Sequence, residues 1–302
     1  MYDIIIIGGG AAGMTAALYS LRSGKTVLLL EKESIGGQIS KSPRVENFPS
    51  IKEITGTDFS DKLFEQISDL GAEFELENVI KVEKNNNIFI VTTDYNNYEA
   101  KAIILATGVK HRHIGVEGED ELIGKGVSYC AVCDGAFYAN EDVALIGDAN
   151  TALQYAILLS NYCKKVYLCT LFDRFFGDDI LVKKIKEREN IEVIHNISLK
   201  EFKHDDALTG LVFENTIDKA NLEINVKACF IAIGQIPEND AFNNLVEIDD
   251  KGYFVCNENL ETKTEGVFVA GDCRSKKIRQ LTTAVSDGAI ASVGAVSYID
   301  KL

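Results

Sequence analysis

The sequence predicts an α/β protein with two dinucleotide-binding, Rossmann-like domains of three layers, the second inserted into the first. Two observations predict this architecture. Short apolar segments of strand length alternate with amphipathic helical stretches along the 302 residues, which is the pattern of α/β chains. One arrangement also occurs twice, at residues 2–31 and 142–170: a strand, a glycine turn, a helix and a second strand. We expect residues 1–113 and 240–302 to form the first domain and residues 114–239 to form the inserted one.

Short apolar runs mark the strands. In chain order, the predicted strands are Asp3–Ile7, Thr26–Glu31, Ala102–Ala106, Val143–Ile146, Lys165–Thr170, Ala228–Ile233 and Val267–Ala270. The first two flank one glycine turn, and the fourth and fifth flank the other. A polar, asparagine-rich region at Asn78–Tyr98 precedes the third strand and predicts a hairpin. Each of the last two strands is followed by glycine.

Composition excludes several classes of protein. Hydrophobic residues make up 46% and charged residues 25% of the chain, which is a globular balance. The longest apolar runs are only strand-sized, far below the roughly 18 residues of a membrane span. The chain enters a strand directly, without the basic segment of a secretory signal, so we expect a cytoplasmic protein with no membrane partner. A net charge of −15 argues against nucleic acid as a partner.

The cysteines and histidines give no sign of a disulfide framework or a metal site. Seven cysteines are an odd number for a disulfide scaffold in a chain of this length. Five of them stand singly in or beside apolar segments and are predicted to be buried small hydrophobic side chains: Cys163, Cys169, Cys229, Cys256 and Cys273. The four histidines have no partners at ligand spacing. We therefore predict no metal.

The first glycine turn has the features of a dinucleotide site. Gly8 allows the tight turn, Gly10 allows the backbone to approach a pyrophosphate, and Gly13 allows the helix and the strand to pack closely. The helix that follows directs its free N–H groups and its positive dipole end at the phosphates. Glu31 ends the second strand, 23 residues after Gly8, where its carboxylate can accept hydrogen bonds from a ribose.

Two later motifs identify the dinucleotide as FAD. Thr107-Gly108 follows one strand, and Gly271-Asp272 follows another. Asp272 alone would be read as a helix N-cap. In this order after the glycine turn, however, the motifs are those of FAD enzymes that contain two dinucleotide-binding folds. We expect Asp272 to bind the ribitol or phosphate region, and Ala106 with the Thr107-Gly108 turn to close over the cofactor.

A Cys-x-x-Cys motif supplies the second redox group. Cys130 and Cys133 have no second cysteine pair to complete a zinc site. Two cysteines at this spacing can close a small disulfide ring suited to exchange. Asp134 follows directly and can transfer a proton as thiolate and thiol interconvert. A pair of buried thiols is the plainer alternative, but the motif stands in a flavoenzyme, immediately before the second dinucleotide fold.

The chain resembles the low-molecular-weight thioredoxin reductases over essentially its whole length. The motifs that carry the resemblance are Gly8–Gly13, Gly36-Gly37-Gln38, Glu46–Pro49, Ala106–Gly108, Cys130–Gly135, Ala270–Asp272 and Arg279-Gln280. The resemblance implies FAD as the cofactor, a homodimer, and thioredoxin as the partner. It also implies that Cys133 faces the flavin, that Cys130 attacks thioredoxin, and that Asp134 is the proton-transfer acid.

The resemblance and the glycine turn together give one set of cofactor residues. The expected FAD-binding residues are Gly8, Gly10, Ala12, Gly13, Glu31, Gly37, Gln38, Asn47, Ala106, Thr107, Gly108, Gly271, Asp272, Arg279 and Gln280. Gln38, Asn47 and Gln280 are expected to touch the flavin ring. Because one sulfur cannot meet flavin and thioredoxin at once, we expect the two domains to change their relative placement, with hinges near residues 113 and 240.

The second glycine turn departs from the family. Counting from the first turn, Gly147 corresponds to Gly8 but Ala149 stands where Gly10 should be, so a methyl group occupies the position a pyrophosphate approaches. Asp148 adds a negative charge there. Thr170, Leu171 and Phe172 replace the His-Arg-Arg cluster with which NADPH-dependent members grip the 2′-phosphate.

Without a nucleotide site, the flavin needs another electron source. Flavins accept single electrons, so a one-electron protein donor is possible. A ferredoxin-dependent flavin thioredoxin reductase branch is similar in lacking the NADPH motif, and we predict membership of that branch, with ferredoxin as the donor. Three alternatives stay open: an NAD(P)H thioredoxin reductase with an atypical site, a dithiol oxidase, and a non-catalytic flavin redox sensor.

An acidic ferredoxin would need a local basic surface on this acidic chain. Residues 274–279 contain four cations, Arg274, Lys276, Lys277 and Arg279, just after Gly271-Asp272. Lys110, His111 and Arg112 follow the Thr107-Gly108 turn. Each run is equally compatible with an ordinary solvated face. Their position beside the flavin motifs makes them candidate docking sites.

Overall fold

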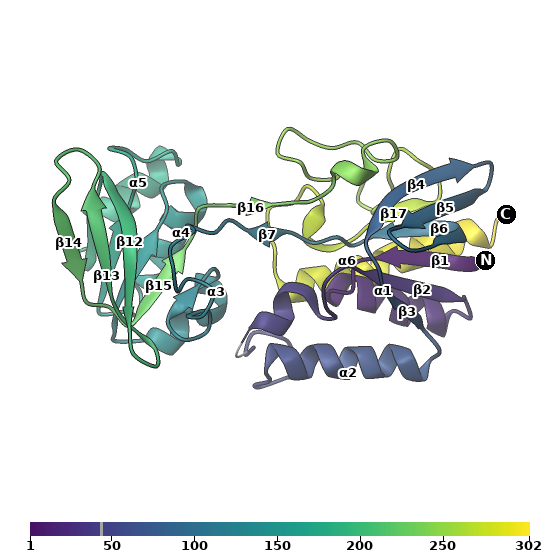
Figure 1. Cartoon of the computed structure of the whole chain (residues 1–302), viewed down its shortest axis with the longest axis horizontal. Coiled ribbons are helices and arrows are strands. Elements are labelled where there is room, and N and C mark those ends of the chain that lie inside the picture. Colours follow the sequence, from purple (N-terminus) through teal and green to yellow (C-terminus); the bar gives the residue numbers. More distant parts are fainter. Residues whose placement is uncertain (43–44) are drawn as a thin grey trace. The chain divides into compact units, whose positions relative to one another are not determined.

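The computed structural model describes residues 1–42 and 45–302 and divides the chain into two compact units (Figure 1). The outer unit consists of Met1–Lys110 and Ile236–Leu302, and the inserted unit consists of His111–Gln235. The predicted boundaries near 113 and 240 lie a few residues further along the chain. The two connecting segments, β7 (Lys110–His111) and β16 (Gln235–Ile236), pair with each other in a two-stranded sheet.

The described strands of the outer unit form one sheet. They are β1 (Tyr2–Ile7), β2 (Val27–Glu31), β3 (Glu73–Leu76), β4 (Val79–Asn85), β5 (Ile88–Thr93), β6 (Asn97–Leu105) and β17 (Val267–Val269). The order is β3-β2-β1-β6-β5-β4, and β17 pairs with β6. The two halves of strand β6 have different partners: the first half pairs antiparallel with β5, and the second half pairs parallel with β17.

The isoleucine run of β1 explains why the outer unit has a layer on each face of this sheet. Ile4 and Ile6 belong to one buried cluster, and Ile5 and Ile7 belong to another. Successive side chains of a strand point to opposite faces, so a strand that is apolar at every position is buried on both. The first cluster packs under α1 (Ala11–Arg22) and α6 (Leu281–Ile299), and α2 (Gly56–Asp69) packs beside α1.

Irregular segments connect these layers. Helix α2 begins at Thr55, whose side chain accepts a hydrogen bond from the Asp58 amide at 3.0 Å, a standard N-cap. Three short 3₁₀ turns lie at η1 (Gly37–Lys41), η3 (Asp240–Phe242) and η4 (Gly271–Cys273). Two of them, η1 and η4, contain predicted cofactor residues.

The inserted unit has the same plan. A parallel sheet in the order β11-β10-β9-β15-β8 lies between helices on one face and a small antiparallel sheet, β12-β13-β14, on the other. The strands are β8 (Val127–Ser128), β9 (Asp142–Ile146), β10 (Lys165–Cys169), β11 (Ile191–Ile194), β12 (Ile197–His204), β13 (Leu208–Asn215), β14 (Asn221–Ile224) and β15 (Ala228–Ile231). The helical segments are α3 (Ala131–Asp134), η2 (Gly135–Tyr138), α4 (Asn150–Leu159) and α5 (Asp179–Lys186).

The predicted α/β class with two Rossmann-like domains is confirmed. Five predicted strands were one or two residues too long. Strand β2 begins at Val27 rather than Thr26, and β6, β10, β15 and β17 end at Leu105, Cys169, Ile231 and Val269 rather than at Ala106, Thr170, Ile233 and Ala270. No apolar run predicted the sheet β12-β13-β14. Among the described residues, no helix has both the length and the apolar character needed to cross a bilayer.

Candidate active site

The first glycine turn leaves no room for side chains at two positions. Gly8 has a φ of +114°, and a Cβ there would lie 2.2 Å from the Ala106 carbonyl oxygen. A Cβ at Gly13 would lie 1.8 Å from the Gly8 carbonyl oxygen. Both positions therefore require glycine. Gly10, by contrast, has open space around it: the nearest atom to its Cβ position is the Gly36 carbonyl oxygen at 3.8 Å.

Open space at Gly10 and the start of α1 are what a pyrophosphate needs. Gly10 is the N-cap of α1 and has no side chain to satisfy the first amides of the helix. Gly36 and Gly37 lie against it, since Gly10 bridges Gly36 and the Gly37 Cβ position is 3.3 Å from the Gly10 Cα. The site thus presents backbone rather than side chains to a ligand.

Glu31 lies at the end of β2, as predicted. Its Oε2 accepts the Gly9 amide at 2.7 Å, and its Oε1 accepts the Glu33 amide at 2.9 Å. The carboxylate therefore fixes the glycine turn as well as standing at the ribose position. A carboxylate has about four lone-pair sites, so these two bonds leave acceptor capacity for ribose hydroxyls.

The Thr107-Gly108 turn is held by a residue that the sequence analysis did not identify. Asn239 is 1% exposed; its Oδ1 accepts the Thr107 hydroxyl at 2.8 Å, and its Nδ2 donates to the carbonyls of Gly252 and Cys273 at 2.9 Å. Asn239 therefore joins the turn after β6 to the segment that carries Asp272. No local motif marks it, because its partner Thr107 lies 132 residues away in the sequence.

The Gly271-Asp272 turn contains a buried acid. Asp272 Oδ1 is buried and has no hydrogen bond to a described residue, although Lys276 Nζ lies 3.1 Å away as an ion-pair partner. Burial raises the pKa of this carboxyl, against the opposing effect of Lys276. A buried polar atom without a hydrogen bond indicates a missing partner. The buried Asp272 oxygen and the open backbone at Gly10 together fit the polar groups of the predicted FAD.

A charge network supports this turn from the last helix. Asp287, in α6, accepts the Gly271 amide at 3.1 Å, two Arg274 nitrogens at 2.9 Å and Lys276 Nζ at 3.0 Å. Burial opposes ionisation, but the bonds to Arg274 and Lys276 outweigh it and hold the pKa of Asp287 below its ordinary value. The sequence analysis did not assign Asp287 a role.

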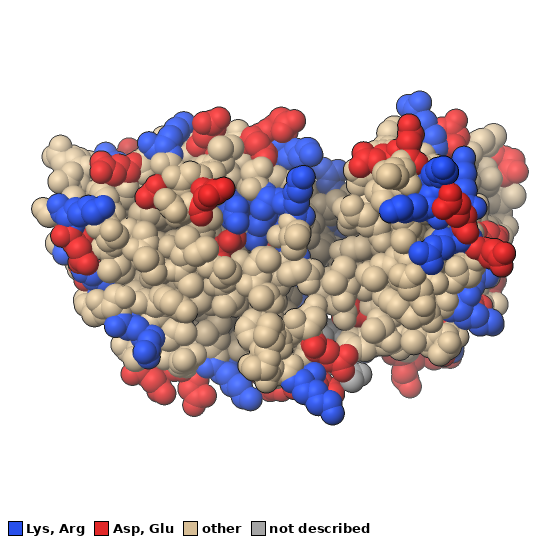
Figure 2. All heavy atoms as spheres, turned by 180° about the vertical axis from the view of Figure 1, so that it is seen from behind, with Lys and Arg blue, Asp and Glu red and all other residues tan. Residues whose placement is uncertain are grey.

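This network pairs most cations of the two predicted basic runs. Arg274 and Lys276 are bound to Asp287, and Arg279 donates to three backbone carbonyls while its guanidinium lies 4.1 Å from the Tyr253 ring. Lys110 is likewise paired, with Glu33 at 2.7 Å. Lys277 and Arg112 are exposed, so a docking role for these runs stays a prediction. On the face shown in Figure 2, acidic and basic side chains both occur, and several basic ones lie next to one another near the middle of the view.

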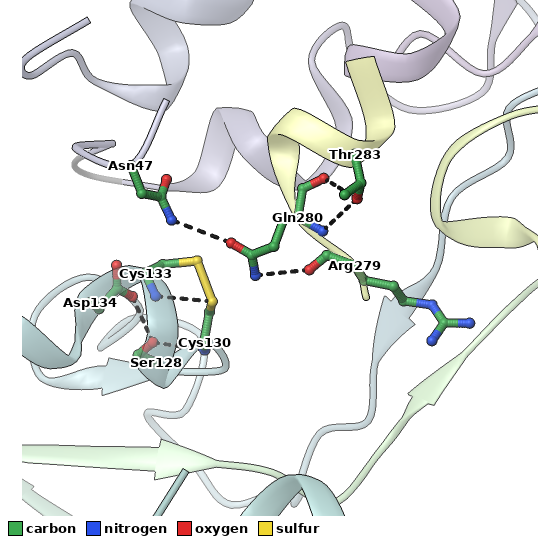
Figure 3. Close-up of a disulfide and its surroundings, with 8 residues drawn as sticks. All are labelled: Asn47, Ser128, Cys130, Cys133, Asp134, Arg279, Gln280 and Thr283. Carbon is green, nitrogen blue, oxygen red and sulfur yellow. Dashed lines mark hydrogen bonds between the residues drawn. A yellow bond between two sulfur atoms is a disulfide. The ribbon is translucent and has the colours of Figure 1, made fainter. Parts of the chain in front are cut away.

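Three predicted flavin-contact residues make polar contacts within the outer unit. Asn47 Nδ2 donates to Gln280 Oε1 at 3.3 Å (Figure 3). Gln280 is also the N-cap of α6, in a capping box with Thr283. Gln38 donates to the Val109 carbonyl at 3.1 Å. The structure thus brings Asn47 and Gln280 together, from segments far apart in the sequence.

The Cys-x-x-Cys pair forms a disulfide at the start of α3. The Cα atoms of Cys130 and Cys133 are 5.3 Å apart. Cys130 is the N-cap of α3: its sulfur accepts the Cys133 amide at 3.2 Å, and its carbonyl accepts the amides of Cys133 and Asp134. The local helical turn therefore brings the two sulfurs within bonding distance, as Figure 3 shows.

Asp134 lies beside this disulfide in an apolar setting. Its Oδ2 accepts the Ser128 hydroxyl at 2.6 Å, and its Oδ1 is buried with no hydrogen bond to a described residue (Figure 3). Burial raises the pKa of the carboxyl, and the Ser128 hydrogen bond lowers it to a smaller extent. A carboxyl that holds its proton closer to neutral pH can act as a general acid.

The glycine turn of the inserted unit differs from the first turn as predicted. Ala149 is the N-cap of α4, where the first turn has Gly10. The segment after β10 forms hydrogen bonds with the residues at the start of this helix. The Phe176 amide donates to the Asp148 carbonyl, and the Asp178 amide donates to Asn150 Oδ1. Burial raises the pKa of Asp148, the acid that stands in the turn.

The three positions that follow β10, where a nucleotide ribose and its phosphate would bind, carry neither an acid nor a cation. Thr170 is fully buried; its hydroxyl donates to the Phe172 carbonyl at 2.7 Å and therefore accepts from His195 Nδ1, also at 2.7 Å. Leu171 and Phe172 are about half exposed, and Phe172 contacts Phe176 edge-to-face. The position presents apolar side chains to solvent where a phosphate-binding site would present cations.

Comparison with known proteins agrees with this arrangement. The family model described as pyridine nucleotide-disulphide oxidoreductase matches residues 2–288. A thioredoxin reductase of Listeria monocytogenes is 39% identical over 303 residues, covering 100% of this chain and 95% of the relative. A "34.2 kDa protein in rubredoxin operon" of Clostridium pasteurianum is 37% identical over 298 residues, covering 98% and 97%. The crystal structure of thioredoxin reductase from Streptococcus pyogenes superposes with a TM-score of 0.96 at 35% identity, covering 100% and 99%. The chain therefore belongs to the pyridine nucleotide-disulphide oxidoreductase family and, within it, to the low-molecular-weight thioredoxin reductases, which bind FAD.

Proposed function

We propose that this thioredoxin reductase receives its electrons from a ferredoxin rather than from NAD(P)H. One observation carries the proposal: the position that should grip a nucleotide ribose is closed by the protein's own bonds. The Thr170 side chain is buried and its hydroxyl bonds to Phe172 and His195, and the next two side chains, Leu171 and Phe172, are apolar. Losing a bidentate phosphate contact costs a few kcal/mol in such a site, and Asp148 adds repulsion.

A one-electron carrier is compatible with the cofactor. FAD, when bound, supplies the electron pair that reduces the Cys130–Cys133 disulfide and can itself be reduced one electron at a time. The Clostridium pasteurianum relative is named for its rubredoxin operon. This name supports a protein as the electron donor here.

The chain's own residues would then carry out the thiol chemistry. In the proposed division of roles, Cys133 receives electrons from the flavin side, and Cys130 attacks the thioredoxin disulfide as a thiolate. Asp134 gives a proton to a departing thiolate and recovers it from solvent. The residues proposed to hold FAD are those of the sequence prediction, with Asn239 and Asp287 holding their turns in place.

The charge of the chain sets how a ferredoxin would approach. The net charge is −15, and most of the predicted basic runs are paired internally. Encounter with an acidic protein therefore lacks electrostatic steering. We expect added salt to leave the rate of ferredoxin oxidation unchanged or to raise it, the opposite of a steered complex.

NAD(P)H is the second candidate, since the matching family is described as pyridine nucleotide-disulphide oxidoreductases. Anaerobic stopped-flow mixing separates the two. The FAD-loaded enzyme is mixed with excess NADPH, NADH or pre-reduced ferredoxin, and flavin absorbance is followed. We expect bleaching within seconds with ferredoxin and none with either nucleotide. Rapid bleaching by a nucleotide would overturn the proposal.

The same preparation tests the two remaining alternatives. A dithiol oxidase would consume oxygen when given a small dithiol. If the rate of oxygen consumption, measured with an oxygen electrode, does not exceed the rate without enzyme, the protein lacks that activity. A non-catalytic sensor would not turn over thioredoxin disulfide. Repeated reduction of thioredoxin by enzyme kept reduced with dithionite would exclude a sensor.

We also propose that the enzyme is a homodimer that joins through the outer unit. A groove of about 780 Å³ runs between residues 259–268 and the outward side of α6. Ile290, Val293 and Leu302 line it with apolar side chains that are 41%, 60% and 56% exposed. A contiguous exposed apolar patch of this kind marks an interaction site, and the family resemblance favours a second copy as its occupant.

A further inference from the structure

The hydroxyl of Ser128 connects the redox disulfide to the nearby acid. Ser128 ends β8 and is 5% exposed. Its Oγ accepts the Cys130 amide at 3.0 Å and is 2.6 Å from Asp134 Oδ2 (Figure 3). No sequence motif assigned this serine a role. It contacts both parts of the exchange chemistry, the segment that carries Cys130 and the carboxyl proposed as the acid.

The two contacts determine the direction of each hydrogen bond. A backbone amide can only donate, so the Ser128 oxygen accepts from Cys130. The hydroxyl has a single proton, and its one remaining partner is Asp134 Oδ2. The hydroxyl donates to Oδ2. A proton on Oδ2 would have to donate to the serine oxygen instead and would leave the serine proton without a partner among the described residues, so Oδ2 is the less favourable oxygen for protonation.

The other carboxylate oxygen has no such constraint. Asp134 Oδ1 is buried and bonds to no described residue. The ionisable groups that feel this carboxylate are Tyr138 in η2 and Tyr155 in α4, whose pKa values are both raised by burial and then by the negative charge of Asp134. Neither tyrosine donates a hydrogen bond to it. Oδ1 is thus the oxygen on which a proton can sit without conflict.

We propose that Ser128 is a positioning residue that confines the acidic proton of Asp134 to Oδ1, the oxygen free to exchange it with a thiolate. In the step itself the Oδ1–H bond breaks and an S–H bond forms on the thiolate released during disulfide exchange. No electrons move, and the carboxylate that remains keeps its Ser128 hydrogen bond through Oδ2. This role of Ser128 rests on the proposed function, in which Asp134 is the acid that protonates a thiolate during exchange with thioredoxin.

The test compares three serine variants in the FAD-loaded enzyme. Ser128→Ala removes the hydroxyl, Ser128→Thr keeps it, and Ser160→Ala is a matched control: Ser160 is also buried in the inserted unit, but its hydroxyl donates to the Ile157 carbonyl at 2.8 Å. Enzyme reduced with dithionite is mixed with oxidised thioredoxin, and the single-turnover rate is measured from pH 5 to 9.

Two results together would support the proposal. We expect Ser128→Ala to slow the exchange about tenfold, part of the range of general acid catalysis. We also expect its alkaline limb to shift to higher pH, because the Ser128 hydrogen bond lowers the pKa of Asp134 and its loss raises that pKa. Ser128→Thr should stay within about twofold of the native rate with an unshifted profile, and Ser160→Ala should match the native enzyme.

Other results would overturn it. Equal loss in the Ala and Thr variants would mean that Ser128 acts through packing, and a native pH profile in Ser128→Ala would mean that it does not act on Asp134. If Ser128→Ala does not fold, Ser128→Gly makes the same deletion. Asp134→Asn separates this inference from the proposed function: a native rate in that variant would remove Asp134 as the acid, whatever Ser128 does.

Discussion

Asp287 binds the guanidinium of Arg274 through two hydrogen bonds of 2.9 Å, and this pair ties the last helix to the turn that presents Asp272. The Asp287 side chain is 6% exposed, and it also accepts Lys276 Nζ and the Gly271 amide. The turn that we propose to bind the cofactor is thus held by a charged side chain of the last helix.

Replacing Asp287 with Asn should destabilise the protein by about 3 kcal/mol near neutral pH, because it leaves buried cations without their counterion. The pKa of Asp287 is lower in the folded protein than in the unfolded chain. Its contribution is therefore present above the unfolded value of about 4 and is lost as the pH falls through the folded value. Chemical denaturation at several pH values should show the native and variant curves converging in acid.

Asp300→Asn is the matched control for this experiment. Asp300 is the C-cap of the same helix, pairs with Lys25 and is 59% exposed. An exposed ion pair contributes little, so the change should stay within about 0.5 kcal/mol. If Asp287→Asn is no more destabilising than Asp300→Asn, the Asp287 network does not hold the turn.

Removing either predicted cofactor acid should weaken FAD retention. Glu31→Ala loses the carboxylate that fixes the Gly9 amide, and Asp272→Ala loses the buried oxygen that pairs with Lys276 but has no hydrogen bond to a described residue. Each change deletes a charge-assisted acceptor. Flavin absorbance per protein after gel filtration should fall in both variants but not in Glu83→Ala, an exposed acid on β4. Full flavin content in both would remove these two residues from the site.

The nucleotide fold should regain affinity when its surface is rebuilt. We expect Asp148→Asn, Ala149→Gly, Leu171→Arg and Phe172→Arg together to bring NADPH binding into a measurable range, because each new arginine can contribute about tenfold through a phosphate contact. Thr170 is kept, since it is buried and its hydroxyl bonds within the unit. Isothermal titration of oxidised enzyme measures the affinity.

Ile180→Arg controls for a general effect of added charge in this experiment. Ile180 is 64% exposed in the same unit, on α5. That variant alone should not bind NADPH. If the rebuilt variant binds no better than the control, the loss of the motif is not what prevents nucleotide binding.

The two redox cysteines should trap different species. Cys133→Ser should accumulate a mixed disulfide between Cys130 and thioredoxin, because the resolving thiol is gone. Cys130→Ser should form no such adduct and should show an altered flavin spectrum from a thiolate near the ring. Both variants should lose turnover. Mass spectrometry locates the adduct, and its appearance at Cys133 in Cys130→Ser would exchange the two roles.

A charge in the α6 groove should dissociate the proposed dimer. Val293 is 60% exposed and lines the groove. Placing a carboxylate at the centre of an apolar interface leaves it buried and unpaired, so Val293→Asp should sediment as a monomer. Tyr95→Asp, at a position that is 77% exposed and does not line the groove, should sediment like the native protein. If native enzyme is itself a monomer at micromolar concentration, the proposed interface is wrong.

Local patterns predicted much of this fold and site. The glycines of the first turn, the acid that ends β2 and the Cys-x-x-Cys motif have fixed spacings that read directly from sequence. Asn239, Asp287 and Ser128 do not. Their partners are set by tertiary structure: Thr107 lies 132 residues from Asn239, and Ser128 reaches Asp134 only because the chain turns at the disulfide. A single sequence carries no signal of such pairings.

The internal pairing of the basic run at 274–279 was not predictable from the sequence for the same reason. Counted along the chain, its four cations resemble an exposed patch, but two are bound to Asp287 and one donates to backbone carbonyls. Linear charge patterns record composition and not which side chains are buried. The antiparallel sheet β12-β13-β14 was missed because polar residues interrupt its strands, so no continuous apolar run marks them.

The dependence of the first glycine turn on the last helix has a consequence for biosynthesis. Gly288 in α6 packs so closely on Ala12 that a Cβ would lie 2.2 Å from its carbonyl oxygen, and β17 completes the sheet beside β6. Residues 267–299 are synthesised after the whole of the inserted unit. The outer unit therefore cannot close until they are made, whereas the inserted unit, complete at residue 235, can fold before them. We expect flavin loading to follow the synthesis of α6, so a ribosome-stalled chain that ends near residue 260 should carry a folded dithiol unit and no FAD.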